Sequence, residues 1–74
     1  MLLSELKEGQ TGIIVRVGGS GALRRRVLEM GLTKGSEIYV EKYAPLKDPL
    51  ELIIKDYHIS LRIEEAANIT VDKL

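Results

Sequence analysis

The sequence contains 74 residues, of which 45% are hydrophobic and 30% charged, and it has no cysteine. A chain this short builds one hydrophobic core, so we predict a single domain over residues 1–74. Its 11 basic and 11 acidic residues cancel. Zero net charge weighs against a general nucleic-acid-binding protein, because such proteins carry an excess of Lys and Arg. The lack of cysteine excludes thiol catalysis and zinc knuckles.

The apolar stretches are short, and none approaches the roughly 20 residues that a helix needs to span a bilayer. The N-terminal segment MLLSELKEG lacks the basic start and long apolar stretch of a signal peptide. We therefore expect a cytoplasmic protein with no membrane insertion.

The first predicted strand spans residues 12–17, where apolar residues alternate as they do in a half-buried strand. Its predicted core face carries three apolar residues, Ile13, Val15 and Val17. This phase leaves Ile14 on the outer face beside Arg16, and a run of glycines then ends the strand.

The one long helix is predicted over residues 22–30. We expect Ser20 to cap its N-terminus through the side-chain hydroxyl. Gly31 can adopt the left-handed conformation that ends a helix, and Leu32 is then expected to fold back onto Val27 in a Schellman ending.

Alternating apolar residues predict four further strands, in chain order within residues 37–43, 50–54, 59–63 and 69–71. Pro45 and Pro49 predict a loop over residues 44–49, and a tight turn is expected near Asp56. Residues 64–67 can form one helical turn. Five short strands with one helix predict an all-β fold, a small curved antiparallel sheet that forms a partly open barrel.

The glycine-rich segment before the helix, VGGSGALRR, has a superficial likeness to a phosphate-binding loop. It lacks the lysine followed by Ser or Thr that a P-loop requires, and Arg24 stands where a dinucleotide fingerprint has its third glycine. A helix N-terminus near arginines can still attract an anion. We favour a flexible strand-to-helix turn and keep anion binding as the alternative.

His58 is the only histidine, and as a metal ligand it would need carboxylate partners such as Asp56 or Glu51. Alternation places it on an outer face with Ser60 and Arg62, so a solvent-exposed histidine is the favoured interpretation. The acidic residues are scattered, mostly on polar faces, and no nucleophile motif is present. We therefore expect no enzyme, no cofactor and no metal site.

Three adjacent arginines, Arg24, Arg25 and Arg26, lie in the first half of the predicted helix. Because successive helical residues are rotated by about 100°, the three side chains fan through about 200° and cannot share one direction. The apolar stripe that packs on the sheet comprises Leu23, Val27 and Met30. Arg25 can pair weakly with Glu29 one turn later. Cations near a helix N-terminus oppose the macrodipole, which argues against a purely stabilising role.

Several apolar or aromatic residues are expected outside the core, on outer strand faces or in the proline-bounded loop: Ile14, Tyr39, Tyr43, Leu46 and Ile53. A sheet this small cannot cover them all. Tyrosine and arginine are favoured at protein interfaces, so a partner surface is one interpretation. The other is the scattered apolar surface of any small domain.

Four segments occur in a distinctive order: L-x-x-L-x-x-G at Leu3, Leu6 and Gly9, the helix segment RRRVLEMGLTKG, the loop APLKDPL and the run ISLRIEEAANITV. Together they resemble the FeoA family, the small cytoplasmic components of bacterial ferrous iron transport. The resemblance covers nearly the whole chain and implies an SH3-like barrel. It also implies an accessory role for FeoB, the permease whose cytoplasmic part carries a GTPase. A related domain occurs at the C-terminus of iron-dependent repressors.

The resemblance and the arginine positions together predict an interaction module that docks on the cytoplasmic region of a FeoB-type permease. The predicted partner-binding residues are Arg24, Arg25, Arg26, Pro45, Leu46, Asp48 and Pro49. Other functions stay open: a nucleic-acid or anion contact through the same arginines, and transition-metal binding through His58. Weak homo-oligomers could also form through an exposed sheet edge. The neutral net charge disfavours nucleic acid.

Overall fold

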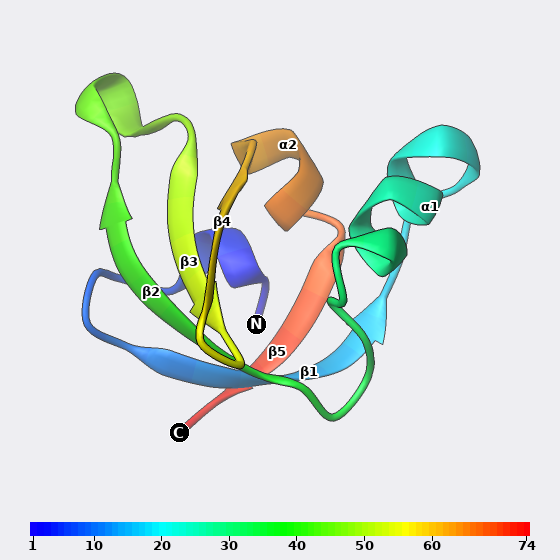
Figure 1. Cartoon of the computed structure of the whole chain (residues 1–74), viewed down its shortest axis with the longest axis horizontal. Coiled ribbons are helices and arrows are strands. Elements are labelled where there is room, and N and C mark those ends of the chain that lie inside the picture. The colour runs from blue at the N-terminus through cyan, green and yellow to red at the C-terminus, as the bar shows by residue number, and fades with distance from the viewer.

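Five antiparallel strands form one sheet in the order β4-β3-β2-β1-β5 (Figure 1). The computed structural model describes all 74 residues. Its strands are β1 (Thr11–Val17), β2 (Glu37–Tyr43), β3 (Leu50–Ile54), β4 (Tyr57–Leu61) and β5 (Ile69–Lys73). Its helical segments are α1 (Gly21–Glu29), the single turn α2 (Ile63–Ala66), and the 3-10 turns η1 (Leu3–Glu5) and η2 (Pro45–Lys47). The predicted all-β class is confirmed. Neither α-helix has the length and apolar character needed to cross a membrane.

The strongly curved sheet wraps around one hydrophobic core (Figure 1). The core consists of 14 buried residues: Leu3, Leu6, Ile14, Val27, Leu32, Ile38, Val40, Leu50, Leu52, Ile54, Leu61, Ala66, Ile69 and Val71. The alternation predicted for β3 is confirmed, because every second residue of that strand is buried. Helix α1 contributes only Val27 to the buried set, so most of its surface faces solvent.

The face predicted for β1 is wrong. Ile14 is 1% exposed and belongs to the core, whereas Ile13 and Val15 are half-buried. The reason is a β-bulge between Ile14 and Arg16 in the pairing with β5, which shifts the alternation so that Val17 again packs against the core. Gly12 also faces the core, but a Cβ there would lie 3.1 Å from a methyl group of Leu6, so the position holds no side chain. The hydrophobic alternation of the sequence therefore does not mark this core-facing position.

A second bulge, between Val40 and Lys42, likewise turns Tyr43 inward. Tyr43 was expected on the outer surface, but it packs against the core, and its hydroxyl donates to the carbonyl oxygens of Ser4 at 3.2 Å and of Leu6. Burial, with a smaller contribution from the Glu8 carboxylate, raises the pKa of Tyr43 above its ordinary value. Tyrosine 43 therefore fastens the N-terminal segment to β2.

Helix α1 ends as predicted. Gly31 adopts φ of 91°, its N–H donates to Leu28 O at 3.0 Å, and the Leu32 N–H donates to Val27 O at 3.4 Å. These two bonds are those of a Schellman motif. At the other end Ser20 occupies the N-cap position, but its side chain makes no capping hydrogen bond, so that detail of the prediction is wrong.

Two turns place residues other than glycine in the left-handed region. In the turn between β3 and β4, Lys55 and Asp56 have φ of 48° and 70°, as a type I′ turn requires. In η2, Leu46 and Lys47 have φ of 69° and 64°. This conformation carries Leu46 into solvent, where it is 98% exposed, as expected for that loop.

Candidate interaction site on helices α1 and α2

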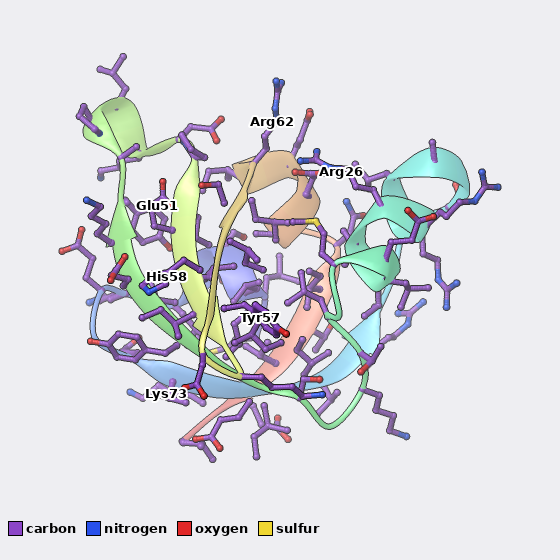
Figure 2. All side chains as sticks on the ribbon, viewed as in Figure 1. Arg26, Glu51, Tyr57, His58, Arg62 and Lys73 are labelled. Carbon is purple, nitrogen blue, oxygen red and sulfur yellow. The ribbon has the colours of Figure 1, made fainter.

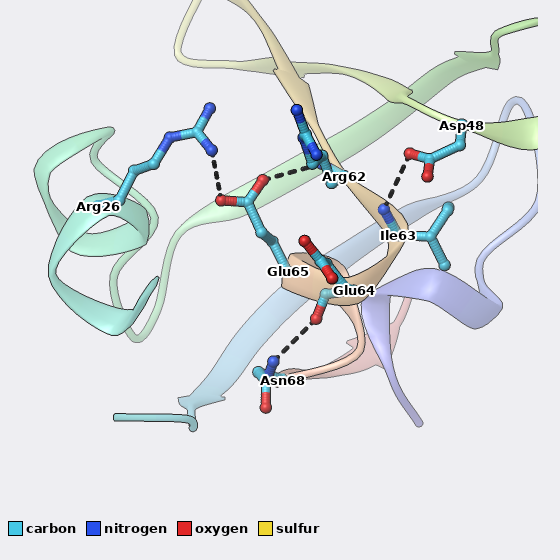
Figure 3. A network of polar contacts seen from close by, with 7 residues as sticks. All are labelled: Arg26, Asp48, Arg62, Ile63, Glu64, Glu65 and Asn68. Carbon is cyan, nitrogen blue, oxygen red and sulfur yellow. Dashed lines mark hydrogen bonds and ion pairs between the residues drawn. The ribbon is translucent and has the colours of Figure 1, made fainter. Parts of the chain in front are cut away.

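The three arginines of α1 diverge. Arg26 Nη1 donates to Glu65 Oε2 at 2.6 Å (Figure 3). Arg24 Nε instead donates to Val17 O at 3.4 Å. Arg25 makes no hydrogen bond or ion pair, so the pair expected between Arg25 and Glu29 is not formed. Arg26 is therefore bonded to α2, whereas the guanidinium groups of Arg24 and Arg25 have no acidic partner at the surface.

Glu65 is an exception to the expectation that the acidic residues mostly lie on polar faces. Its side chain is only 3% exposed, while that of Arg26 is 55% exposed. Its second oxygen, Oε1, accepts the N–H of Arg62 at 3.0 Å, which caps α2. Burying a carboxylate requires such partners, because an unpaired buried charge is costly. The same side chain therefore starts α2 and fastens α1 to it.

The proline-bounded loop is fastened to the same turn of α2. Asp48 Oδ1 accepts the N–H of Ile63 at 3.2 Å (Figure 3). In Figure 1, η2 and α1 stand at the same end of the barrel with α2 between them. Segments far apart in the sequence therefore converge on one turn of helix, which holds the loop and the arginine helix in a fixed relation.

A profile of the FeoA domain matches residues 1–73. The chain belongs to the FeoA family. It is 51% identical over 72 residues to the Fe(2+) transport protein A/Fe(2+) transporter FeoB fusion protein of Porphyromonas gingivalis. The match covers 97% of this chain but 8% of that much longer protein.

Solved FeoA structures share the fold. The FeoA-like protein of Clostridium acetobutylicum is 34% identical, with a TM-score of 0.93 over all of this chain and 86% of that one. FeoA of Stenotrophomonas maltophilia, solved with zinc and described as a procaryotic SH3 domain protein, is 32% identical with a TM-score of 0.85. That match covers 97% of this chain and 89% of the other. The SH3-like barrel implied by the FeoA motifs is confirmed.

In this FeoA domain the remaining predicted site residues lie in or beside η2. Pro45, Leu46 and Asp48 are exposed, and Pro49 is half-buried. No sequence pattern indicated that Glu65 would join Arg26, because 39 positions separate the two residues. The available signal was local: Glu65 lies three residues after the N-cap residue Arg62, the spacing of a capping box, in which the acid faces back to the start of the helix.

His58 lies on the outer face of β4, away from Arg26 and Arg62 (Figure 2). Its side chain is 68% exposed, and its Nδ1 lies 3.8 Å from Glu41 Oε1. Glu51 accepts a hydrogen bond from the Ser60 hydroxyl at 2.7 Å. The fold brings together no group of three His or acidic side chains able to hold a metal ion. The solvent-exposed histidine predicted from alternation is therefore what the structure shows.

Proposed function

We propose that this chain is a non-enzymatic, cytoplasmic accessory domain of ferrous iron transport, acting through residues 1–74 as one unit. It docks on the cytoplasmic, GTPase-bearing region of a FeoB-type permease. The proposed contacts are Arg24, Arg25, Arg26, Pro45, Leu46, Asp48 and Pro49.

The observation that carries this proposal is the fusion relative. In that protein a segment 51% identical to this chain shares one polypeptide with the FeoB transporter. A covalent link gives two modules a high effective concentration, which favours a pair that works in contact. A FeoA domain that works in contact with a permease needs a surface that is complementary to it.

The end of the barrel that carries α1, α2 and η2 has the features of such a surface. Leu46 is almost fully exposed, and a protruding apolar side chain on a fixed loop fits a pocket of a partner. Arg24 and Arg25 are exposed, and arginine is enriched at interface hot spots. Arg26 acts differently: through Glu65 it holds α1 in place, and about half of its side chain stays available.

The test measures the Kd between this chain and the purified cytoplasmic domain of a FeoB-type permease, by biolayer interferometry. We expect Arg24→Ala, Arg25→Ala and Leu46→Ser each to weaken binding by about fivefold or more, the size of effect that marks an interface residue. The two arginine variants also reduce the dependence of Kd on salt, since they remove charges from the contact.

The matched control is Lys42→Ala, which removes a cation from the exposed face of β2, outside the proposed surface. It should leave Kd unchanged. Normal binding by all three site variants would disprove the assigned surface, while absence of binding by the unmodified chain would disprove the docking function itself.

A further inference from the structure

An open pocket of about 510 Å³ lies between the end of β1 and α1. Its lining residues come from the end of β1, the glycine turn that follows, α1 and the turn before β2; Figure 1 shows where these segments lie. Its lining consists of Val15, Arg16, Val17, Gly18, Gly19, Arg24, Leu28 and Lys34. Three separate segments of chain therefore each contribute one cation: Arg16, Arg24 and Lys34.

The charge of this pocket differs from that of every other hollow on the molecule. The lining contains three basic side chains and no acidic one. Each of the other three hollows contains at least one acid next to a base. In a chain with 11 acids for 11 bases, such local segregation leaves a site of positive potential.

The three cations are also unpaired. The only ion pairs in the structure are Arg26 with Glu65 and His58 with Glu41, so no carboxylate neutralises the pocket. Arg24 makes one contact, from Nε to Val17 O, which holds the side chain over the end of β1 and leaves both terminal nitrogens free. Like charges gathered around one hollow repel one another, and an anion bound between them would relieve that repulsion.

We propose that Arg16, Arg24 and Lys34 form a binding site for a phosphate group. Guanidinium groups match phosphate oxygens with paired hydrogen bonds, and the lysine ammonium adds a compact charge. The pocket is larger than a phosphate ion, so it accepts a phosphate ester whose organic part rests against Val15 and Leu28. The ester is either a soluble phosphorylated molecule or the headgroup of an anionic phospholipid.

This site shares one residue with the proposed docking surface. Arg24 belongs to both, but Arg16 and Lys34 belong to the pocket alone, so their variants report on phosphate binding independently of the permease. The two proposals can therefore fail separately.

The first experiment titrates the labelled chain with sodium phosphate at constant ionic strength and follows backbone amide shifts by NMR. Gly18 and Gly19 line the pocket, so their amide signals should show the largest saturable shifts. Arg16→Gln, Arg24→Gln and Lys34→Gln should each weaken phosphate binding about two- to fivefold, as expected for one exposed charge contact. Lys42→Gln, with the same change in charge on β2, should bind as the unmodified chain does.

The second experiment measures co-sedimentation with vesicles of phosphatidylcholine alone or with phosphatidylglycerol. Binding to the anionic vesicles that the three pocket variants weaken identifies a lipid headgroup as the source, and phosphate binding without vesicle binding identifies a soluble ester. The proposal is overturned if neither probe binds, if sodium chloride produces the same shifts, or if Lys42→Gln weakens binding as much as the pocket variants do.

Discussion

The two sides of α1 differ in what their cations contact. On the side facing α2, Arg26 forms an ion pair with Glu65, whose side chain is only 3% exposed. On the side facing β1, Arg24 joins Arg16 and Lys34 around a pocket without an acid. Within one arginine triplet, Arg26 therefore makes a structural contact, whereas Arg24 lines a pocket whose positive charge is not neutralised.

The charge of an arginine alone therefore does not determine its role. An arginine bonded to a buried carboxylate stabilises the fold, because removing either partner leaves a polar group without its hydrogen bond. An arginine among other cations has no favourable charge interaction in the isolated domain. Its charge therefore contributes to binding only when an anion or an acidic partner is present. Mutations on the two sides should separate stability from binding.

The largest expected effect comes from Glu65→Ala. It removes the acceptor of Arg26 and the cap of α2 together, so we expect the free energy of unfolding to fall by about 2–3 kcal/mol. Urea denaturation followed by circular dichroism measures this loss. Glu65→Gln keeps the volume and one acceptor, and should lose less. If Glu65→Ala unfolds at the same urea concentration as the unmodified chain, the buried carboxylate has no structural role.

Gly31→Ala perturbs the end of α1 without touching either group of charges. Nothing lies within 4 Å of a Cβ built there, so the cost is that of holding alanine at φ of 91°, about 1–2 kcal/mol. Thermal unfolding measures it. Because Gly31 lines neither the pocket nor the Arg26–Glu65 contact, this variant should not change phosphate binding while the domain stays folded. Selective loss of binding would show that the pocket depends on how α1 ends.

Arg26→Gln should cost less, about 1 kcal/mol, because the guanidinium is half exposed and solvent weakens its pairing with Glu65. A double-mutant cycle of Arg26→Gln with Glu65→Gln measures the coupling between the two side chains. Zero coupling energy would mean that the ion pair contributes nothing to stability and that Glu65 acts through the cap of α2 alone.

Much of the fold could be predicted from the sequence, and the exceptions have physical causes. Local signals sufficed for β2, whose bounds match the prediction, and for the Schellman ending at Gly31. They failed where a bulge shifts the alternation, since a bulge depends on pairing with a distant strand. Ile14 and Tyr43 were assigned to the outer surface for this reason.

The charged contacts were less predictable. Helical geometry correctly required the arginines to diverge, but it could not identify which of them would meet an acid. Glu65 lies 39 residues from Arg26, and only the folded chain brings Arg16 and Lys34 to the same pocket as Arg24. Pairing of this kind is decided by tertiary structure, whereas the exposure of Leu46 followed from the proline-bounded loop itself.

The smallest effect on stability is expected for Arg24→Gln, and this variant distinguishes the two sides of α1 most directly. Removing a cation from a cluster without acids relieves repulsion and loses only the long contact to Val17 O, so the urea midpoint should stay unchanged or rise slightly. Lowering the salt concentration strengthens repulsion, so the gain of the variant over the unmodified chain should grow in low salt. Arg26→Gln, on the side of α1 that faces α2, should behave in the opposite way. Because this variant loses an attraction, its loss of stability relative to the unmodified chain should grow in low salt. If both variants respond to salt with the same sign, the two sides of α1 are electrostatically alike, and Arg24 has an acidic neighbour in solution.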